Sequence, residues 1–181
     1  MATARTRSLV TILFLLCAAR PGEGGPHAPC TAPPDVREHI RVSDCGLAQA
    51  VAIGMERSET FRQTVARVKA LNGIVYVSGT YVSQPSAKRV LYGALQHRIV
   101  RAGDARVLFV IVVPGHENTH IARLAHELQH AIEVLESGET TDSGVERLFE
   151  RIGVETSART FETEAAGAIE RRVAKELAGR R

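Results

Sequence analysis

The sequence predicts an α+β fold, and three observations along the chain lead to this prediction. Apolar residues recur at helical spacing between residues 43 and 71. Extended apolar runs replace that spacing between residues 74 and 113, and helical spacing returns between residues 121 and 177. Helical and extended segments separated along the chain in this way are typical of an α+β domain. We expect a small mixed sheet with further helices at the C-terminal end.

The first 19 residues have the composition of an export signal. Arg5 and Arg7 precede an apolar stretch from Leu9 to Leu16, and small residues follow at positions 18 and 19. The stretch is too short to cross a bilayer, which requires about 20 apolar residues. We therefore expect residues 1–19 to be cleaved as a signal peptide, leaving a secreted or periplasmic protein with no stable membrane span.

Residues 20–42 are rich in proline and glycine and are expected to form a leader, followed by a single domain over residues 43–181. Cys30 in this leader and Cys45 at the start of the domain remain after signal cleavage. An even number of cysteines in an exported chain favours a disulfide between them, with two free thiols as the alternative.

The first half of the domain is expected to pass from helices to strands. Thr60 and Gln63 have capping-box spacing, which predicts two helices between residues 43 and 71, and Asn72-Gly73 ends this section. Strands are expected over residues 74–82, 89–100 and 107–113. The last strand is apolar without interruption and is expected to be buried on both faces.

Three helices are expected after Pro114-Gly115. The first covers residues 121–136 and the second covers residues 143–152, where Ser143 and Glu146 have capping-box spacing. The third covers residues 161–177, with Thr160 as its N-cap.

The metal-binding pattern H-E-x-x-H occurs twice, at residues 116–120 and 126–130. On a helix, two histidines four residues apart lie on one face, so both rings reach one ion. The glutamate between them can then take a proton from water. The first copy follows Pro-Gly directly and precedes the helical period, so His116 and His120 are expected not to share a face.

The second copy lies inside a predicted helix, and we expect it to bind the metal. Leu124, Leu128, Ile132 and Leu135 form an apolar stripe, and His126 and His130 occupy a different face. This helix follows the most apolar strand, so it is expected to pack on the sheet. A catalytic zinc site needs three protein ligands, so one more must come from elsewhere.

The stretch Phe161-Glu162-Thr163-Glu164-Ala165-Ala166 supplies the missing carboxylate. Together with His-Glu-Leu-Gln-His it resembles the gluzincin branch of zincin-type peptidases, and in particular short bacterial members. The resemblance implies a zincin-like fold, Zn²⁺ bound by His126, His130 and Glu162, and Glu127 as general base. Ala166 replaces the aspartate that orients a metal-binding histidine in many gluzincins, so another residue must take that role.

Several alternatives remain open from the sequence. Glu164 would point away from Glu162 on a shared helix, and Glu133 lies on the face of His126 and His130 as a ligand or as a hydrogen-bond acceptor. Candidate partners for a developing oxyanion are Tyr76, Tyr81, Tyr92 and His97.

These observations predict an exported zinc metallopeptidase acting on a peptide or protein substrate. The alternative is a non-catalytic zinc-binding envelope protein, which a fourth protein ligand would favour. Nucleic acid is not an expected partner. The chain has no Trp, its net charge is only +3, and cleavage after residue 19 would remove two arginines.

Overall fold

The computed structural model describes residues 33–79, 92–157 and 160–179. A four-stranded sheet has the order β1-β2-β4-β3. β1 is parallel to β2 and β2 to β4, whereas β3 is antiparallel to β4. The predicted α+β class with a small mixed sheet is therefore confirmed. The strands are β1 (Ile40–Val42), β2 (Gly73–Ser78), β3 (Gly93–Ala102) and β4 (Ala105–Val112).

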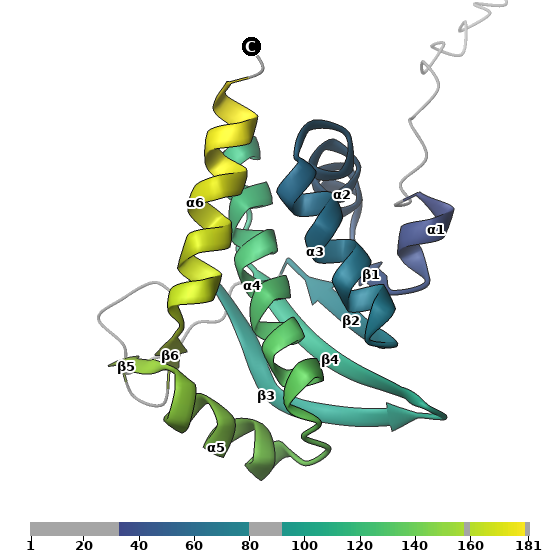
Figure 1. Ribbon diagram of the computed structural model, residues 1–181. Helices are drawn as coiled ribbons and strands as arrows, with labels where there is room; N and C mark the ends of the chain where they lie inside the picture. Colours follow the sequence, from purple (N-terminus) through teal and green to yellow (C-terminus); the bar gives the residue numbers. More distant parts are fainter. Residues whose placement is uncertain (1–32, 80–91, 158–159, 180–181) are drawn as a thin grey trace, which may run out of the picture.

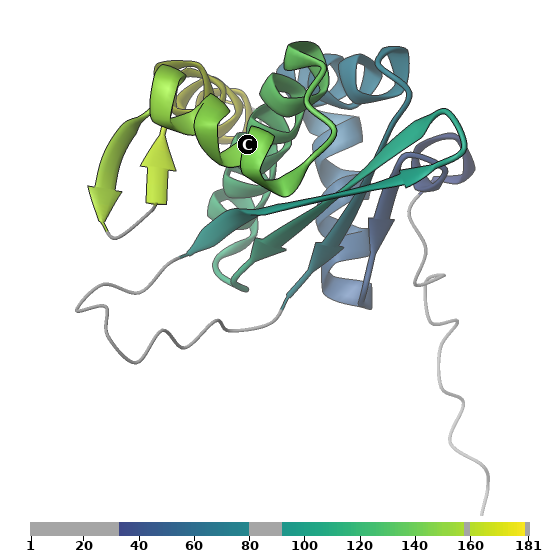
Figure 2. The same cartoon turned by 90° about the horizontal axis from the view of Figure 1, so that it is seen from below.

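The helices lie on one face of this sheet, with α4 crossing it and α6 running alongside α4 (Figure 1). In Figure 2, α5 and α6 lie above the sheet, on the same side of it. A separate two-stranded hairpin precedes α6. The helices are α1 (Pro34–Arg37), α2 (Cys45–Arg57), α3 (Glu59–Ala70), α4 (Glu117–Ser137), α5 (Asp142–Ile152) and α6 (Glu164–Ala178), and the hairpin is β5 (Val154–Ser157) and β6 (Thr160–Glu162).

The sheet buries one face against the helices. Val75, Val77, Leu108 and Val110 are almost fully buried, while Phe109 between the last two is only partly buried. Successive side chains of a strand point to opposite faces, so this alternation marks a covered face and an open one. The expectation that β4 is buried on both faces is wrong, because the helices of the described chain all pack on one side.

The expected break between two N-terminal helices is confirmed, but its cap is Ser58 and not Thr60. The Ser58 hydroxyl accepts a hydrogen bond from the Phe61 amide at 3.0 Å, which starts α3. α3 ends before Asn72, whose φ of 52° lies in the left-handed region and turns the chain into β2.

α4 is longer than predicted and is buried around most of its circumference. It starts at Glu117, four residues earlier than expected, and ends at Gly138, where a φ of 78° suits a residue without Cβ. Arg106 of β4 donates hydrogen bonds to the carbonyl groups of Val134 and Leu135 at this end. These contacts fix the helix on the sheet and satisfy carbonyls that have no helical partner.

The folded domain begins earlier than the predicted boundary at residue 43. Val36 and Ile40 are buried, and β1 pairs with β2, so residues 34–42 belong to the domain and not to the leader. Cys45 is disulfide-bonded. Its expected partner Cys30 lies outside the described residues, as do the predicted signal peptide and the end of the strand predicted to reach residue 82.

The C-terminal helix also differs from its prediction. α6 starts at Glu164 with Thr163 as its N-cap, and residues 160–162 form strand β6. The hairpin was not expected, because its strands have only four and three residues. The N-cap of α5 is Thr141, two residues before the predicted capping box.

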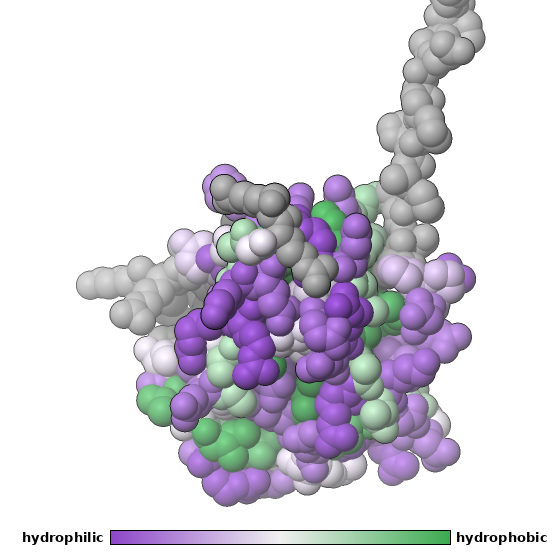
Figure 3. Space-filling model, turned by 45° about the horizontal axis from the view of Figure 1, so that its top comes forward, coloured by the Kyte–Doolittle hydropathy of each residue, from purple (hydrophilic) through white to green (hydrophobic). Residues whose placement is uncertain are grey.

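None of the helices in the described ranges has the length and apolar character that crossing a bilayer requires. The side of the molecule seen in Figure 3 is largely hydrophilic, as expected where helices face solvent.

Candidate metal centre

His126, Glu127 and His130 project from the middle of α4, and Glu162 comes from the end of β6. The two histidines are 8% and 4% exposed, and Glu127 is 5% exposed. The Glu162 side chain is about half exposed. Because α6 packs along α4, the short turn from β6 into α6 places Glu162 over the two rings.

Among the described residues, one group of His, Cys, Asp or Glu side chains fits a metal ion. It consists of His126, His130 and Glu162, and one ligand atom from each residue lies within 4.8 Å of the other two. His126 Nε2 is 2.9 Å from Glu162 Oε2, and His130 Nε2 is 4.0 Å from the same oxygen. Ligand atoms around a tetrahedral zinc ion are about 3.4 Å apart. Small side-chain movements therefore bring the three groups to zinc-binding distances.

Glu127 is placed beside this group without a partner of its own. Its Oε2 atom is buried and has no hydrogen-bond partner among the described residues. Burial raises the pKa of Glu127 to about 7, although the nearby His130 and His126 act in the opposite direction. An unpartnered buried carboxylate next to three candidate ligands fits a site that holds a metal ion and a water molecule.

Each histidine has a second carboxylate behind it. His126 Nδ1 lies 3.0 Å from Glu170 of α6, and His130 Nδ1 lies 2.9 Å from Glu133 of α4. A carboxylate at Nδ1 keeps a proton on that nitrogen and leaves Nε2 for the metal. Glu133 is thus a hydrogen-bond acceptor on the far side of His130. Glu170 is the acceptor that orients His126, in place of the aspartate that Ala166 replaces.

The surrounding carboxylates control the charge of His126. Burial acts to lower its pKa, but the hydrogen bonds to Glu162 and Glu170 and the charge of Glu127 outweigh burial and raise the pKa to about 10. The contact with His126 lowers the pKa of both Glu162 and Glu170. Such an acidic environment attracts a cation, either a proton or a metal ion.

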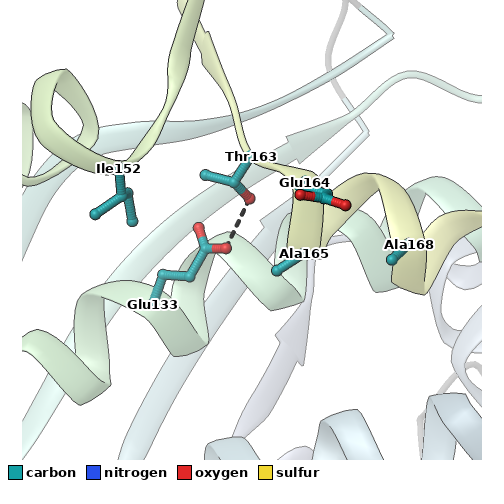
Figure 4. Close-up of a pocket in the computed structure, with 6 residues that line it drawn as sticks. All are labelled: Glu133, Ile152, Thr163, Glu164, Ala165 and Ala168. Carbon is teal, nitrogen blue, oxygen red and sulfur yellow. Dashed lines mark hydrogen bonds between the residues drawn. The ribbon is translucent and has the colours of Figure 1, made fainter.

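Glu133 also connects His130 to the start of α6. Its Oε1 atom accepts a hydrogen bond of 2.7 Å from the Thr163 hydroxyl, which in turn caps α6 by accepting from the Ala166 amide (Figure 4). Thr163 follows Glu162 directly, so one carboxylate helps to place two of the three candidate ligands. A hollow of about 500 Å³ adjoins this contact and is also lined by Ile152, Glu164, Ala165 and Ala168.

Aromatic rings pack beside His130. The ring of Phe149 on α5 meets the His130 ring edge-on, with centroids 5.4 Å apart. His97 of β3 stacks on Phe149 at 5.6 Å and on Phe161 at 6.2 Å. His97 therefore packs between two aromatic rings beside the site.

β3 approaches the candidate base closely. A Cβ atom at Gly93 would lie 2.5 Å from Glu127 Oε1, so this strand end comes nearer than a larger residue would allow. The neighbouring Tyr92 is about half exposed and lies under Arg123 of α4, whose Cζ is 4.1 Å from the ring centroid. Tyr76 lies on the open face of the sheet, away from α4, and Tyr81 lies outside the described residues.

The first H-E-x-x-H copy is not part of this group. His116 is the residue before α4, and His120 is buried in the first turn of that helix, where burial lowers its pKa. The helix therefore starts between the two histidines, as their sequence context predicted. Within the described chain, no group of metal-binding side chains includes either of them.

The sequence missed Glu170, Thr163, Phe149 and Gly93. A signal was present for Glu170, which lies between Ala166 and Val173 on the buried side of α6. A carboxylate on a buried stripe needs a partner. The expectation that Glu162 and Glu164 share a helix is wrong, because Glu162 ends β6 and α6 starts at Glu164.

Comparison of the chain with protein-family models, with curated proteins and with solved structures gives no match.

Proposed function

We propose that this protein is an exported zinc metallopeptidase, with His126, His130 and Glu162 as metal ligands and Glu127 as general base. The observation that supports the proposal is the convergence of three ligand atoms within 4.8 Å beside the buried Glu127, whose Oε2 atom has no hydrogen-bond partner among the described residues. Two imidazoles and one carboxylate form a donor set typical of catalytic zinc. A zinc ion there would act as a Lewis acid toward a peptide carbonyl and toward water.

Glu127 is the group that moves the proton. In this role Glu127 would take a proton from water and pass it to the leaving amine. Glu127 is 5% exposed, so its carboxylate is largely shielded from bulk water. Glu133 and Glu170 keep the two imidazole rings oriented, because each accepts from an Nδ1 atom.

The edge strand β3 offers a place for the peptide. Among the strands of the described ranges, β3 pairs with β4 alone, and its Gly93 end lies against Glu127. An extended peptide can add to such an edge through main-chain hydrogen bonds, which would bring its carbonyl groups past Glu127. The substrate of the proposal is therefore a peptide or protein segment in extended conformation.

The non-catalytic alternative has less support from the geometry. A fourth protein ligand would close the water position, and Glu133 was the candidate for it. Glu133 instead faces Nδ1 of His130 and the Thr163 hydroxyl.

The test is to compare zinc content and hydrolysis of a quenched-fluorescent peptide library for wild type and Glu127→Gln. We expect both proteins to contain one zinc ion, and Glu127→Gln to lose at least 100-fold in kcat/KM. Glu162→Gln should lose zinc, whereas the neighbouring Glu164→Gln should keep zinc and activity. Hydrolysis by Glu127→Gln at the wild-type rate would exclude this base, and zinc without hydrolysis in wild type would favour the non-catalytic alternative.

A further inference from the structure

The open face of the sheet carries a row of side chains that the proposed activity does not use. Arg41 of β1 donates a hydrogen bond of 2.6 Å to the Tyr76 hydroxyl and lies over the Tyr76 ring. Tyr76 of β2 stacks on Phe109 of β4 with centroids 5.9 Å apart. Arg98 of β3 lies over Phe109, with its Cζ 4.9 Å from the ring centroid. We call these four residues the arginine–aromatic row.

The row crosses all four strands because their register aligns it. Arg41 stands opposite Tyr76, and Tyr76 opposite Phe109. The register of β3 against β4 shifts between Leu95 and Ile99, and Arg98 lies within that irregularity. Such a bulge redirects the side chains it contains. Neighbouring strands are about 4.8 Å apart, so the backbone positions of the two arginines, three strand spacings from each other, are about 14 Å apart.

The open face carries two arginines, Arg41 and Arg98, and the four strands contain no aspartate or glutamate. No carboxylate in the described part of the chain forms an ion pair with Arg41 or Arg98; the pairs that do form involve other residues. A hollow of about 280 Å³ lies next to Arg41, and its polar lining includes Ser43, Ser78 and Gln96.

From this geometry we infer that the arginine–aromatic row is a docking site for an acidic, extended segment of a partner protein. Guanidinium groups match carboxylates in a two-pronged hydrogen-bonded geometry. In an extended chain, residues i and i+4 lie on one side about 13 Å apart, which is close to the separation of the backbone positions of Arg41 and Arg98. An apolar side chain at i+2 would lie over the two rings, and a neighbouring side chain would enter the hollow.

Two other kinds of partner fit this face less well. Membrane insertion needs protruding apolar side chains, and here guanidinium groups cover the rings. Base stacking needs free ring faces, and the rings already stack on each other and on the arginines.

The test measures the binding of a fluorescein-labelled peptide that repeats Glu-Ser-Leu-Ser-Glu to the full-length protein. The control peptide has Gln in place of each Glu. We expect micromolar binding of the acidic peptide at 50 mM salt, at least tenfold weaker binding of the control peptide, and weakening as salt increases. Arg98→Gln should weaken binding at least fivefold, whereas Arg101→Gln, an equal loss of charge on the same strand, should change it less than twofold.

Three outcomes would overturn the inference. Equal losses for the two variants would mean unspecific charge attraction. Binding to vesicles with 30% phosphatidylglycerol, with no binding of the peptide, would mean a membrane surface. Self-association that Arg98→Gln abolishes, measured by sedimentation, would mean that a second copy covers the face. Thermal unfolding of each variant verifies that it is folded, and none of these outcomes depends on zinc or hydrolysis.

Discussion

At the scale of single residues, the candidate centre is built from carboxylates that differ in role because they differ in surroundings. Glu162 is half exposed and faces both Nε2 atoms, whereas Glu133 and Glu170 face the Nδ1 atoms. Glu127 is buried and has an oxygen with no partner in the described chain. In the proposed site, one residue type would thus supply a ligand, two orienting acceptors and a base.

Replacing Glu133 should weaken the metal site without removing a ligand. In Glu133→Gln the group facing His130 Nδ1 is no longer a carboxylate, so His130 is oriented less firmly. We expect the zinc dissociation constant, measured by competition with a chelator, to rise about 10- to 100-fold. Glu136→Gln makes the same change one turn later, at an exposed position, and should leave the constant unchanged. Equal affinity for Glu133→Gln and wild type would contradict the role of Glu133.

A methyl group at Gly93 should disturb the base and spare the metal. The added Cβ in Gly93→Ala would lie 2.5 Å from Glu127 Oε1, and the buried side chain has little room to move away. We expect kcat to fall at least tenfold with an unchanged zinc content, since a small misplacement of a reacting group is costly. Gly103→Ala, at the other end of β3, should fold less stably because of its φ of 62° but retain kcat. An unaffected kcat in Gly93→Ala would show that Glu127 is not the base or is free to shift.

At the scale of elements, α6 is held at both ends by polar contacts. Its start is fixed by Thr163 and Glu133 beside the candidate centre. Near its end, Glu176 accepts hydrogen bonds from the Ser58 hydroxyl and from the amide and hydroxyl groups of Thr60, where α3 begins. The position of Glu162 over α4 depends on these contacts, because Glu162 lies just before α6.

Stability should depend on pH through Glu176. Burial acts to raise its pKa, but the hydrogen bonds from Ser58 and Thr60 prevail and lower it below 4.5. The stabilisation is therefore complete above the unfolded-state value near 4.5 and is lost as pH falls through the lower folded-state value. We expect Glu176→Gln to lower the free energy of unfolding by about 1–2 kcal/mol at pH 7.

The measurement is urea unfolding of wild type and Glu176→Gln between pH 3 and pH 7. The difference between the two proteins should shrink as the pH falls below 4.5, because protonated Glu176 resembles glutamine. Glu150→Gln, at an exposed position of α5, serves as control. A difference that stays constant with pH would mean that the charge of Glu176 does not act through these contacts.

At the scale of the whole molecule, a metal ion would join two parts of the chain. His126 and His130 belong to the helix on the sheet, and Glu162 belongs to the hairpin that leads into α6. An ion bound only by the folded arrangement stabilises it by mass action, by about 4 kcal/mol when free zinc is 1,000 times its dissociation constant. Binding should therefore secure the C-terminal segment on the rest of the domain.

Removal of the metal should lower the thermal stability. We expect treatment with EDTA to decrease Tm by about 8–16 °C, since each kcal/mol corresponds to about 2–4 °C in a domain of this size. Added zinc should restore the original Tm. In Glu162→Gln, Tm should respond to neither treatment. An identical Tm before and after EDTA treatment, with loss of zinc verified, would show that the ion does not join the two parts.

The sequence by itself determined the parts that depend on local pattern. Helical spacing located the helix of His126, Glu127 and His130, and the change of period located β2, β3 and β4, because burial of one face imposes these periods on neighbouring residues. The same local reasoning separated His116 from His120, since a helix start between them is visible in the chain.

Only the tertiary structure decided which distant groups meet. Glu162 was proposed as a ligand by resemblance, but its place at a strand end depends on pairing between β5 and β6. Strands of three and four residues are too short to be recognised from the sequence pattern. Glu170 and Glu133 behind the two imidazoles, and the open sheet face with its arginine–aromatic row, follow from how α6, α4 and the sheet pack. Contacts between residues far apart in the chain leave no periodic trace, so the packed structure is needed to show them.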